Sequence, residues 1–172
     1  TYDILLRNVR HNGCRNIETF QSAFSSQDAP LEFLYTPRCS GATSLVEAGQ
    51  PVEPDKLEKI TCPSTTLDSF CAKHELAPDV IKCDVEGAEL MVVQGGERVL
   101  ATHRPVILIE LLRKWSRKFG YHPNDVMKLL GGYGYQAYTL SESGLKPCSA
   151  IDEETVETNF VFLHSQAHGH IA

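Results

Sequence analysis

The feature that most constrains the fold is an apolar run, Val106–Leu111, which follows Pro105 and carries a single acidic residue. Near-continuous apolar runs of this length are typical of strands that are buried on both faces, as in parallel sheets covered by helices. An earlier run, Val80–Val85, also has strand character, and Gly87–Leu100 between the two has helical spacing with a Gly-Gly pair in the middle. This alternation predicts that the two strands are parallel neighbours in one sheet.

The rest of the chain extends the same pattern. Apolar residues at helical spacing predict a helix from Tyr2 that faces a core and ends at Asn12-Gly13, and further helices over 67–76 and from Pro123. Further strands are predicted at residues 17–24, 31–35, 57–62, 135–140 and 159–163, and a long loop at 36–55. We therefore expect an α/β fold with a mostly parallel sheet and an antiparallel C-terminal edge. One domain would cover residues 1–163, followed by a flexible tail at 164–172.

Composition narrows the class of protein. The 172 residues are 42% hydrophobic, which supports a core, and the net charge of −6 disfavours nucleic-acid binding. Glu110 interrupts the longest apolar run, so we expect no membrane span, and no targeting leader follows Thr1. The six cysteines contain no Cys-x-x-Cys pair, which favours reduced thiols in a cytoplasmic enzyme. The basic cluster at 113–118 is interpreted as a solvated face, with contact to an acidic substrate as the less favoured hypothesis.

Acidic residues stand where the two central strands end. Asp84 and Glu86 follow the first strand, and Glu110 ends the second. Ligands of open α/β sheets bind at the carboxyl ends of the strands, so these three carboxylates are candidate catalytic residues. The simpler alternative is that Glu86 and Glu89 stand near the start of the following helix because its dipole stabilises negative charge there. This explanation is sufficient for Glu89, but it is a weaker explanation for Asp84 and Glu110.

The order of several short motifs resembles the FkbM family of methyltransferases. The central motif is Lys82-Cys83-Asp84-Val85-Glu86-Gly87-Ala88-Glu89, and Arg104-Pro105 with the strand ending in Glu110 follows it. The remaining matching segments are Leu5–Asn8, Asn12-Gly13, Ala23–Ser25, Gly41–Leu45, Thr66–Phe70 and Gly95–Leu100. Together they extend the resemblance from residue 1 to about residue 163.

The resemblance implies a Rossmann-like methyltransferase fold and an S-adenosylmethionine-dependent O-methyltransferase acting on a hydroxyl of a sugar or other small natural product. Asp84 and Glu86 would then lie beside the methyl donor and the acceptor hydroxyl. A nearby carboxylate, including that of Glu110, would accept or orient the hydroxyl proton. The cofactor-binding residues implied are Gln21, Ser22, Ala23 and Asp84, with Gln21–Ala23 on the adenine side.

The family pattern also contains a Gly-rich turn after its first strand and an acid after its second, and neither is in this sequence. We therefore expect the chain to hold the later part of the fold without the first two strands, and to bind S-adenosylmethionine weakly or not at all on its own. An upstream segment, a partner or a homodimer would complete it.

Three alternatives stay open. Asp84, Glu86 and Glu110 offer oxygen ligands for Mg²⁺, which would lower the pKa of the acceptor hydroxyl. The fold could serve a non-catalytic interaction module, or a module that binds a small ligand such as a nucleotide sugar. A metal site at His164, His168 and His170 is less favoured than a disordered tail, because no Cys or acidic residue lies nearby in the sequence.

Overall fold

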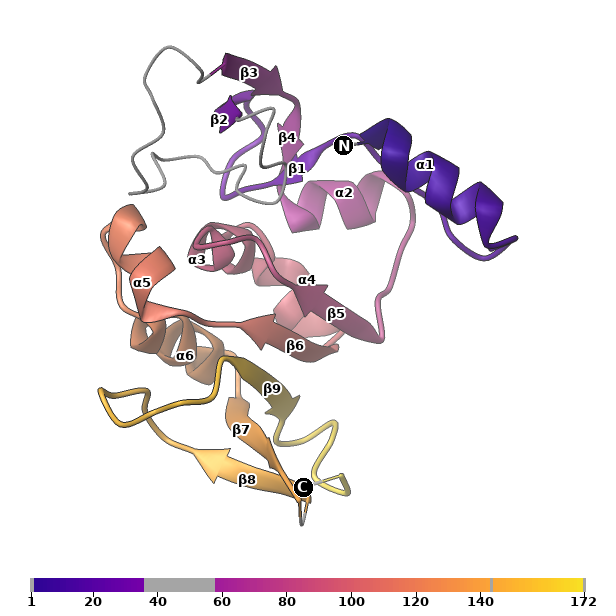
Figure 1. Cartoon of the computed structure of the whole chain (residues 1–172). Coiled ribbons are helices and arrows are strands. Elements are labelled where there is room, and N and C mark those ends of the chain that lie inside the picture. Colours follow the sequence, from indigo (N-terminus) through magenta and orange to yellow (C-terminus); the bar gives the residue numbers. More distant parts are fainter. Residues whose placement is uncertain (1, 36–57, 143, 172) are drawn as a thin grey trace. The chain divides into compact units, whose positions relative to one another are not determined.

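The computed structural model describes residues 2–35, 58–142 and 144–171 (Figure 1). The chain divides into two compact units, one of Thr1–Ala23 with Ala29–Ser64 and one of Phe24–Asp28 with Thr65–Ala172. The sequence predicted one domain over residues 1–163 and did not reveal this division into two units. The predicted loop at 36–55 and the family-like segment Gly41–Leu45 lie outside the described residues.

The first unit contains a helix and an antiparallel strand pair. Helix α1 (Tyr2–His11) forms as predicted and ends before Gly13, whose φ of 64° suits a glycine. Strand β2 (Leu31–Tyr35) pairs with β3 (Glu58–Cys62), with Leu31 opposite Cys62. No side chain of α1 is fully buried: in its apolar stripe, Tyr2, Leu6 and Val9 are half-buried and Leu5 is 45% exposed. The predicted core-facing stripe is therefore covered only in part among the described residues.

The strand predicted over residues 17–24 is reduced to β1 (Ala23–Phe24). The nearby β4 (Ser64–Thr65) is equally short. Ala23 N–H donates to Pro63 O at 2.9 Å, whereas Ile17 is 49% exposed and lies in irregular backbone. Alternating side chains alone do not make a strand, because its backbone needs a neighbouring strand for its ladder of hydrogen bonds.

The second unit is built on a five-stranded sheet in the order β5-β6-β9-β7-β8 (Figure 1). The strands are β5 (Val80–Cys83), β6 (Val106–Glu110), β7 (Tyr135–Ser141), β8 (Gly144–Cys148) and β9 (Asn159–His164). Strands β5 and β6 are parallel neighbours, with Val80 opposite Val106, which confirms the central prediction. The β6–β9, β9–β7 and β7–β8 pairs are antiparallel. The sheet is therefore mixed, and its antiparallel part is larger than the predicted C-terminal edge.

Helices α3 (Glu89–Gln94), α4 (Glu97–Thr102) and α6 (Pro123–Gly132) cover one face of this sheet. The other helical segments of this unit are α2 (Leu67–Lys73), α5 (Arg113–Ser116) and the 3₁₀ turn η3 (Arg117–Phe119). Side chains of α3, α4 and α6 form the core with Ile107, Ile109, Phe160 and Phe162. On the other face of β6, Leu108 is only half-buried. The prediction of a strand buried on both faces therefore holds for one face of β6.

The starts of α2 and α4 are joined by side-chain hydrogen bonds. Thr66 caps α2 as predicted, because its hydroxyl accepts the Ser69 N–H at 3.0 Å. Asp68, predicted as a dipole-favouring acid of α2, also accepts the N–H groups of Arg98 (2.8 Å) and Val99 (2.9 Å). One carboxylate thus fixes the start of α4 against α2.

The C-terminal segment starts inside the sheet. His164, the first residue of the predicted tail, is the last residue of β9 and is 5% exposed. Its Nδ1 accepts the Gln166 N–H at 3.2 Å, and its own N–H donates to His168 Nδ1 at 3.1 Å. The imidazoles of His164 and His168 therefore serve turn hydrogen bonds. Among the described helices, none combines the length and the apolar character that crossing a membrane requires.

Candidate functional site

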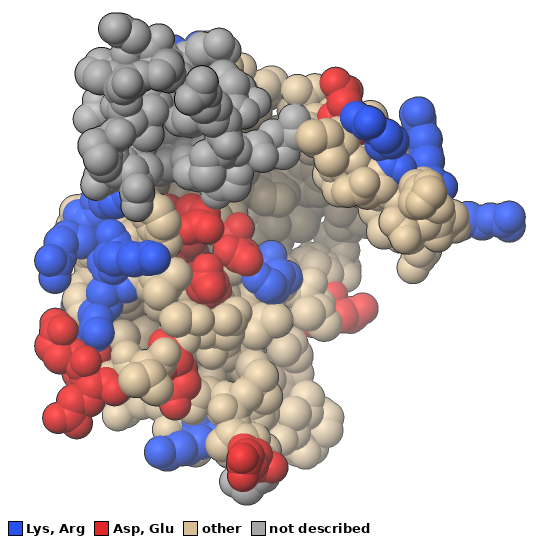
Figure 2. Space-filling view, viewed as in Figure 1, with Lys and Arg blue, Asp and Glu red and all other residues tan. Residues whose placement is uncertain are grey.

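Three carboxylates meet where the parallel strands end. Asp84 follows β5 directly, Glu110 is the last residue of β6, and the register places Cys83 opposite Ile109. One carboxylate oxygen from each of Asp84, Glu86 and Glu110 lies within 4.8 Å of the other two. Figure 2 shows acidic side chains gathered on this face. The predicted convergence of these residues is confirmed, and we call them the carboxylate cluster.

The cluster contains one ion pair and one perturbed acid. Lys82 Nζ lies 2.8 Å from Asp84 Oδ2, and both side chains are about half exposed. Partial burial raises the pKa of Glu110, and the charge of Asp84, a hydrogen bond with Asp84 and the charge of Glu86 raise it further. Glu110 is therefore the member of the cluster best suited to take up a proton.

The backbone holds Glu86 in an unusual conformation. Its φ is 53°, in the left-handed region that non-glycine residues rarely occupy. Its Oε2 is shielded from solvent and has no hydrogen-bond partner among the described residues. Gly87 follows with φ 109°, where a Cβ would lie 2.7 Å from the Phe119 ring. The loop after β5 thus turns sharply and leaves a carboxylate oxygen free to accept a hydrogen bond.

Glu89 secures this loop from inside the fold. It is the first residue of α3, as predicted, but it is only 3% exposed. Its Oε1 accepts the N–H groups of Gly87 (2.9 Å) and Val85 (3.3 Å), and its Oε2 accepts the Tyr121 hydroxyl at 2.9 Å. Its role is therefore more than the dipole interaction that the sequence predicted, and Tyr121 is a supporting residue that the sequence did not reveal.

A pair of substitutions separates these two roles of Glu89. Glu97 is the matched control, because it also starts a helix and accepts a tyrosine hydroxyl (Tyr133, 3.0 Å) but is exposed. Glu89→Ala is expected to lower the free energy of unfolding by about 3 kcal/mol, because it leaves buried donors without an acceptor. Glu97→Ala is expected to lower it by about 1 kcal/mol or less. Equal losses in urea denaturation would mean that the helix dipole accounts for both residues.

The raised pKa of Glu110 predicts how the stability of the protein depends on pH. A folded state that binds the proton more tightly than the unfolded chain loses stability as the pH rises above the ordinary value of 4.5. Glu110→Gln is therefore expected to be more stable than the parent protein near neutral pH and equal to it below the ordinary pKa. Thermal unfolding across this pH range measures the difference, and Glu142→Gln at an exposed turn is the control. A Glu110→Gln protein that is less stable than the parent at neutral pH would contradict the assigned repulsion.

The predicted cofactor-binding residues other than Asp84 belong to the first unit. Gln21 and Ser22 are exposed, and the Ser22 hydroxyl donates to Pro63 O at 3.1 Å. Ala23 begins β1. Their role toward a cofactor stays a prediction. The oxygen atoms of the carboxylate cluster are also of the type that Mg²⁺ prefers, although exposed acids often lie together without an ion.

These observations define the class of protein: an α/β protein whose candidate site is built from carboxylates at the ends of two parallel strands. Residues 5–137 match the family model of the methyltransferase FkbM domain, and the chain belongs to this family. Among solved structures, it is similar to the methyltransferase FkbM from Methylobacillus flagellatus KT, with a TM-score of 0.52 and 16% identity. The match covers 94% of this chain and 33% of the other, so this chain spans about a third of that protein's length. A search of curated proteins gives no match.

Proposed function

We propose that the protein transfers a methyl group from S-adenosylmethionine to a hydroxyl group of a sugar or other small natural product. The observation that carries the proposal is the carboxylate cluster at the ends of β5 and β6, in a chain of the FkbM family. We also infer that the parallel β5–β6 pair and the helices on one face belong to a Rossmann-like sheet.

The chemistry of the cluster suits this reaction. Carboxylate oxygens only accept hydrogen bonds, so they match the hydroxyl groups of an acceptor and of a ribose, and their negative charge favours a sulfonium centre. S-adenosylmethionine supplies the methyl group that the acceptor oxygen attacks. The unpartnered Oε2 of Glu86 offers a hydrogen-bond acceptor that the fold itself does not use.

Each carboxylate has a separate task in this proposal. Asp84, paired with Lys82, orients the acceptor hydroxyl or a cofactor hydroxyl. Glu86 accepts a second hydrogen bond and holds the acceptor in line. Glu110, with its raised pKa, takes the proton as the oxygen–methyl bond forms. Positioning by these groups supplies the remaining acceleration.

The proposal is tested in two measurements on the purified protein. Titration calorimetry with S-adenosylhomocysteine measures occupation of the cofactor site. Release of S-adenosylhomocysteine from S-adenosylmethionine, with a panel of hydroxylated glycosides, measures methyl transfer. Because residues 1–172 alone are expected to bind the cofactor weakly or not at all, absence of both binding and release in the full-length protein would contradict the proposed function. Loss of activity with a chelator and recovery with Mg²⁺ would assign a metal to the cluster.

A further inference from the structure

A second site of opposite charge begins one residue beyond the carboxylate cluster. A cavity of about 370 Å³ lies between the end of β6 with α5 and the loop before β9, and Leu111, directly after Glu110, lines it. Its basic lining residues are Arg113, Lys114 and Arg117, against a single acid, Glu157. We call this cavity the basic groove.

The positive charges of the groove are concentrated and accessible. They lie within five residues of α5 and η3, and Lys114 and Arg117 are exposed. Lys and Arg side chains gather over α5 in Figure 2. The lining holds three cations against one acid, while Asp152, Glu153 and Glu154 stand in the same loop outside the lining, so the lining itself favours an anionic ligand.

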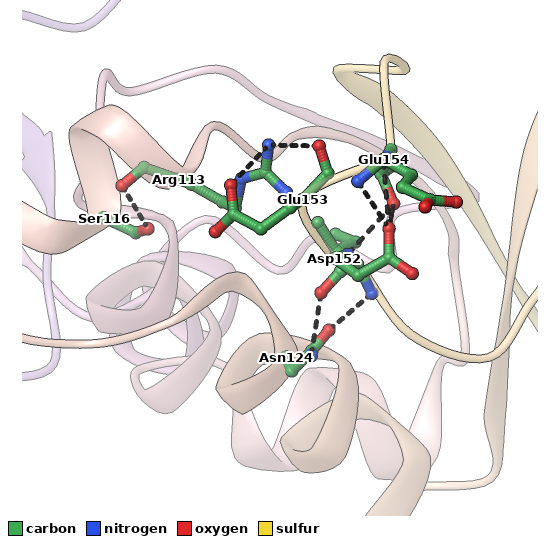
Figure 3. A network of polar contacts seen from close by, with 8 residues as sticks. Arg113, Ser116, Asn124, Asp152, Glu153 and Glu154 are labelled. Carbon is green, nitrogen blue, oxygen red and sulfur yellow. Dashed lines mark hydrogen bonds and ion pairs between the residues drawn. The ribbon is translucent and has the colours of Figure 1, made fainter.

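Arg113 supplies an independent observation. Its Nη1 is shielded from solvent and has no hydrogen-bond partner among the described residues. Its Nη2 donates to Glu153 O at 3.4 Å and lies 3.8 Å from Glu153 Oε2, as Figure 3 shows. The Glu153 side chain is 89% exposed, so this ion pair is weak and is readily replaced. An anion that displaced Glu153 would meet Nη2 of this guanidinium and supply a charge-assisted hydrogen bond.

We propose that the basic groove binds an anionic group, phosphate or carboxylate, of the molecule whose hydroxyl lies at the carboxylate cluster. This inference rests on the proposed function and adds the class of acceptor. The two sites orient such a molecule, because the carboxylate cluster repels its anionic end and the groove attracts it. The acceptor would then present its hydroxyl to Glu110 while its negative charge lies beside Lys114 and Arg117.

The test is a titration of the ¹⁵N-labelled chain at low salt with three sugars: glucose 6-phosphate, glucuronate and glucose. The anionic sugars are expected to shift amide resonances of residues 111–117 and 151–158, and comparison of the two separates phosphate from carboxylate as the preferred group. Lys114→Gln with Arg117→Gln is expected to weaken this binding by about tenfold or more, because charge-assisted hydrogen bonds are lost. Arg10→Gln with Lys146→Gln, which removes two exposed charges from α1 and β8, is expected to leave it unchanged.

The outcomes separate this inference from the proposed function, because the titration needs no methyl donor. Amide shifts with glucose as large as those with the anionic sugars would refute the anion site, even if S-adenosylhomocysteine binds. Equal weakening of anion binding in the Arg10→Gln, Lys146→Gln control would refute it as well. A different outcome is anion binding that depends on Lys114 and Arg117 without methyl transfer to any acceptor. This result would support the anion site and refute its assigned role in catalysis.

Discussion

Methyl transfer is expected to fall by about 10²- to 10⁴-fold in Asp84→Asn and in Glu86→Gln, the range for loss of a proton-transfer or orienting group. Both substitutions keep the shape of the side chain and remove its charge. Asp84→Asn also removes the partner of Lys82 at 2.8 Å, and Glu86→Gln places an amide where the unpartnered Oε2 now lies. Release of S-adenosylhomocysteine under single-turnover conditions measures the change.

The control for this experiment is Glu142→Gln, an exposed acid at the turn between β7 and β8. Far-ultraviolet circular dichroism and the unfolding temperature show that the two variants remain folded. Turnover equal to that of the parent protein in both variants would refute the assignment of the carboxylate cluster.

A loss of stability as large as that of Glu89→Ala is expected at Gly95, between α3 and α4. A Cβ at this position would overlap the carbonyl oxygen of the buried Ser25 and lie 3.3 Å from Thr66 Cβ. The backbone of Gly95 is ordinary (φ −80°), so the requirement for glycine comes from this close approach rather than from conformation. Gly95→Ala is expected to lower the free energy of unfolding by about 3 kcal/mol, because main-chain atoms must move.

For a chain of this length, that loss corresponds to a fall of about 6 to 12 °C in the unfolding temperature. Gly131→Ala is the matched control, because Gly131 lies in α6 and a Cβ there meets nothing within 4 Å. It is expected to be neutral or to stabilise the protein by up to about 1 kcal/mol, since alanine favours the helix. A Gly95→Ala protein as stable as Gly131→Ala would show that Ser25 yields at little cost.

The sequence revealed those parts of the site that depend on neighbouring residues. The apolar runs located β5 and β6, and the polar residue after each strand located Asp84 and Glu110. Cys83, inside the apolar run that located β5, is 4% exposed, and burial raises the pKa of its thiol to about 12. In each of these cases, a local pattern of a few residues determines the position.

Features that depend on pairing or contact with another segment of the chain were not predictable in this way. Strand β8 is largely exposed and contains Pro147, so its sequence lacks the apolar alternation of a strand, and only its pairing with β7 defines it. The hydrogen bond from Tyr121 to Glu89 joins residues 32 positions apart. Lys114 and Arg117 of the basic cluster are exposed, as the predicted solvated face requires, but the loop that lines the groove with them lies about forty residues later, as Arg113 and Glu153 show.

The backbone at Glu86 has a consequence for protein engineering. Three non-glycine residues of the described chain have left-handed backbones: Glu75, Glu86 and Arg104. Glycine relieves this strain, so stability-guided design would favour it at all three positions. At Glu75 and Arg104 the exchange touches no member of the carboxylate cluster, whereas at Glu86 it deletes one. Variants selected for thermal stability would therefore often carry Glu86→Gly and be inactive. The residues found at this position would then reflect the backbone strain of the loop and not the chemistry of the carboxylate.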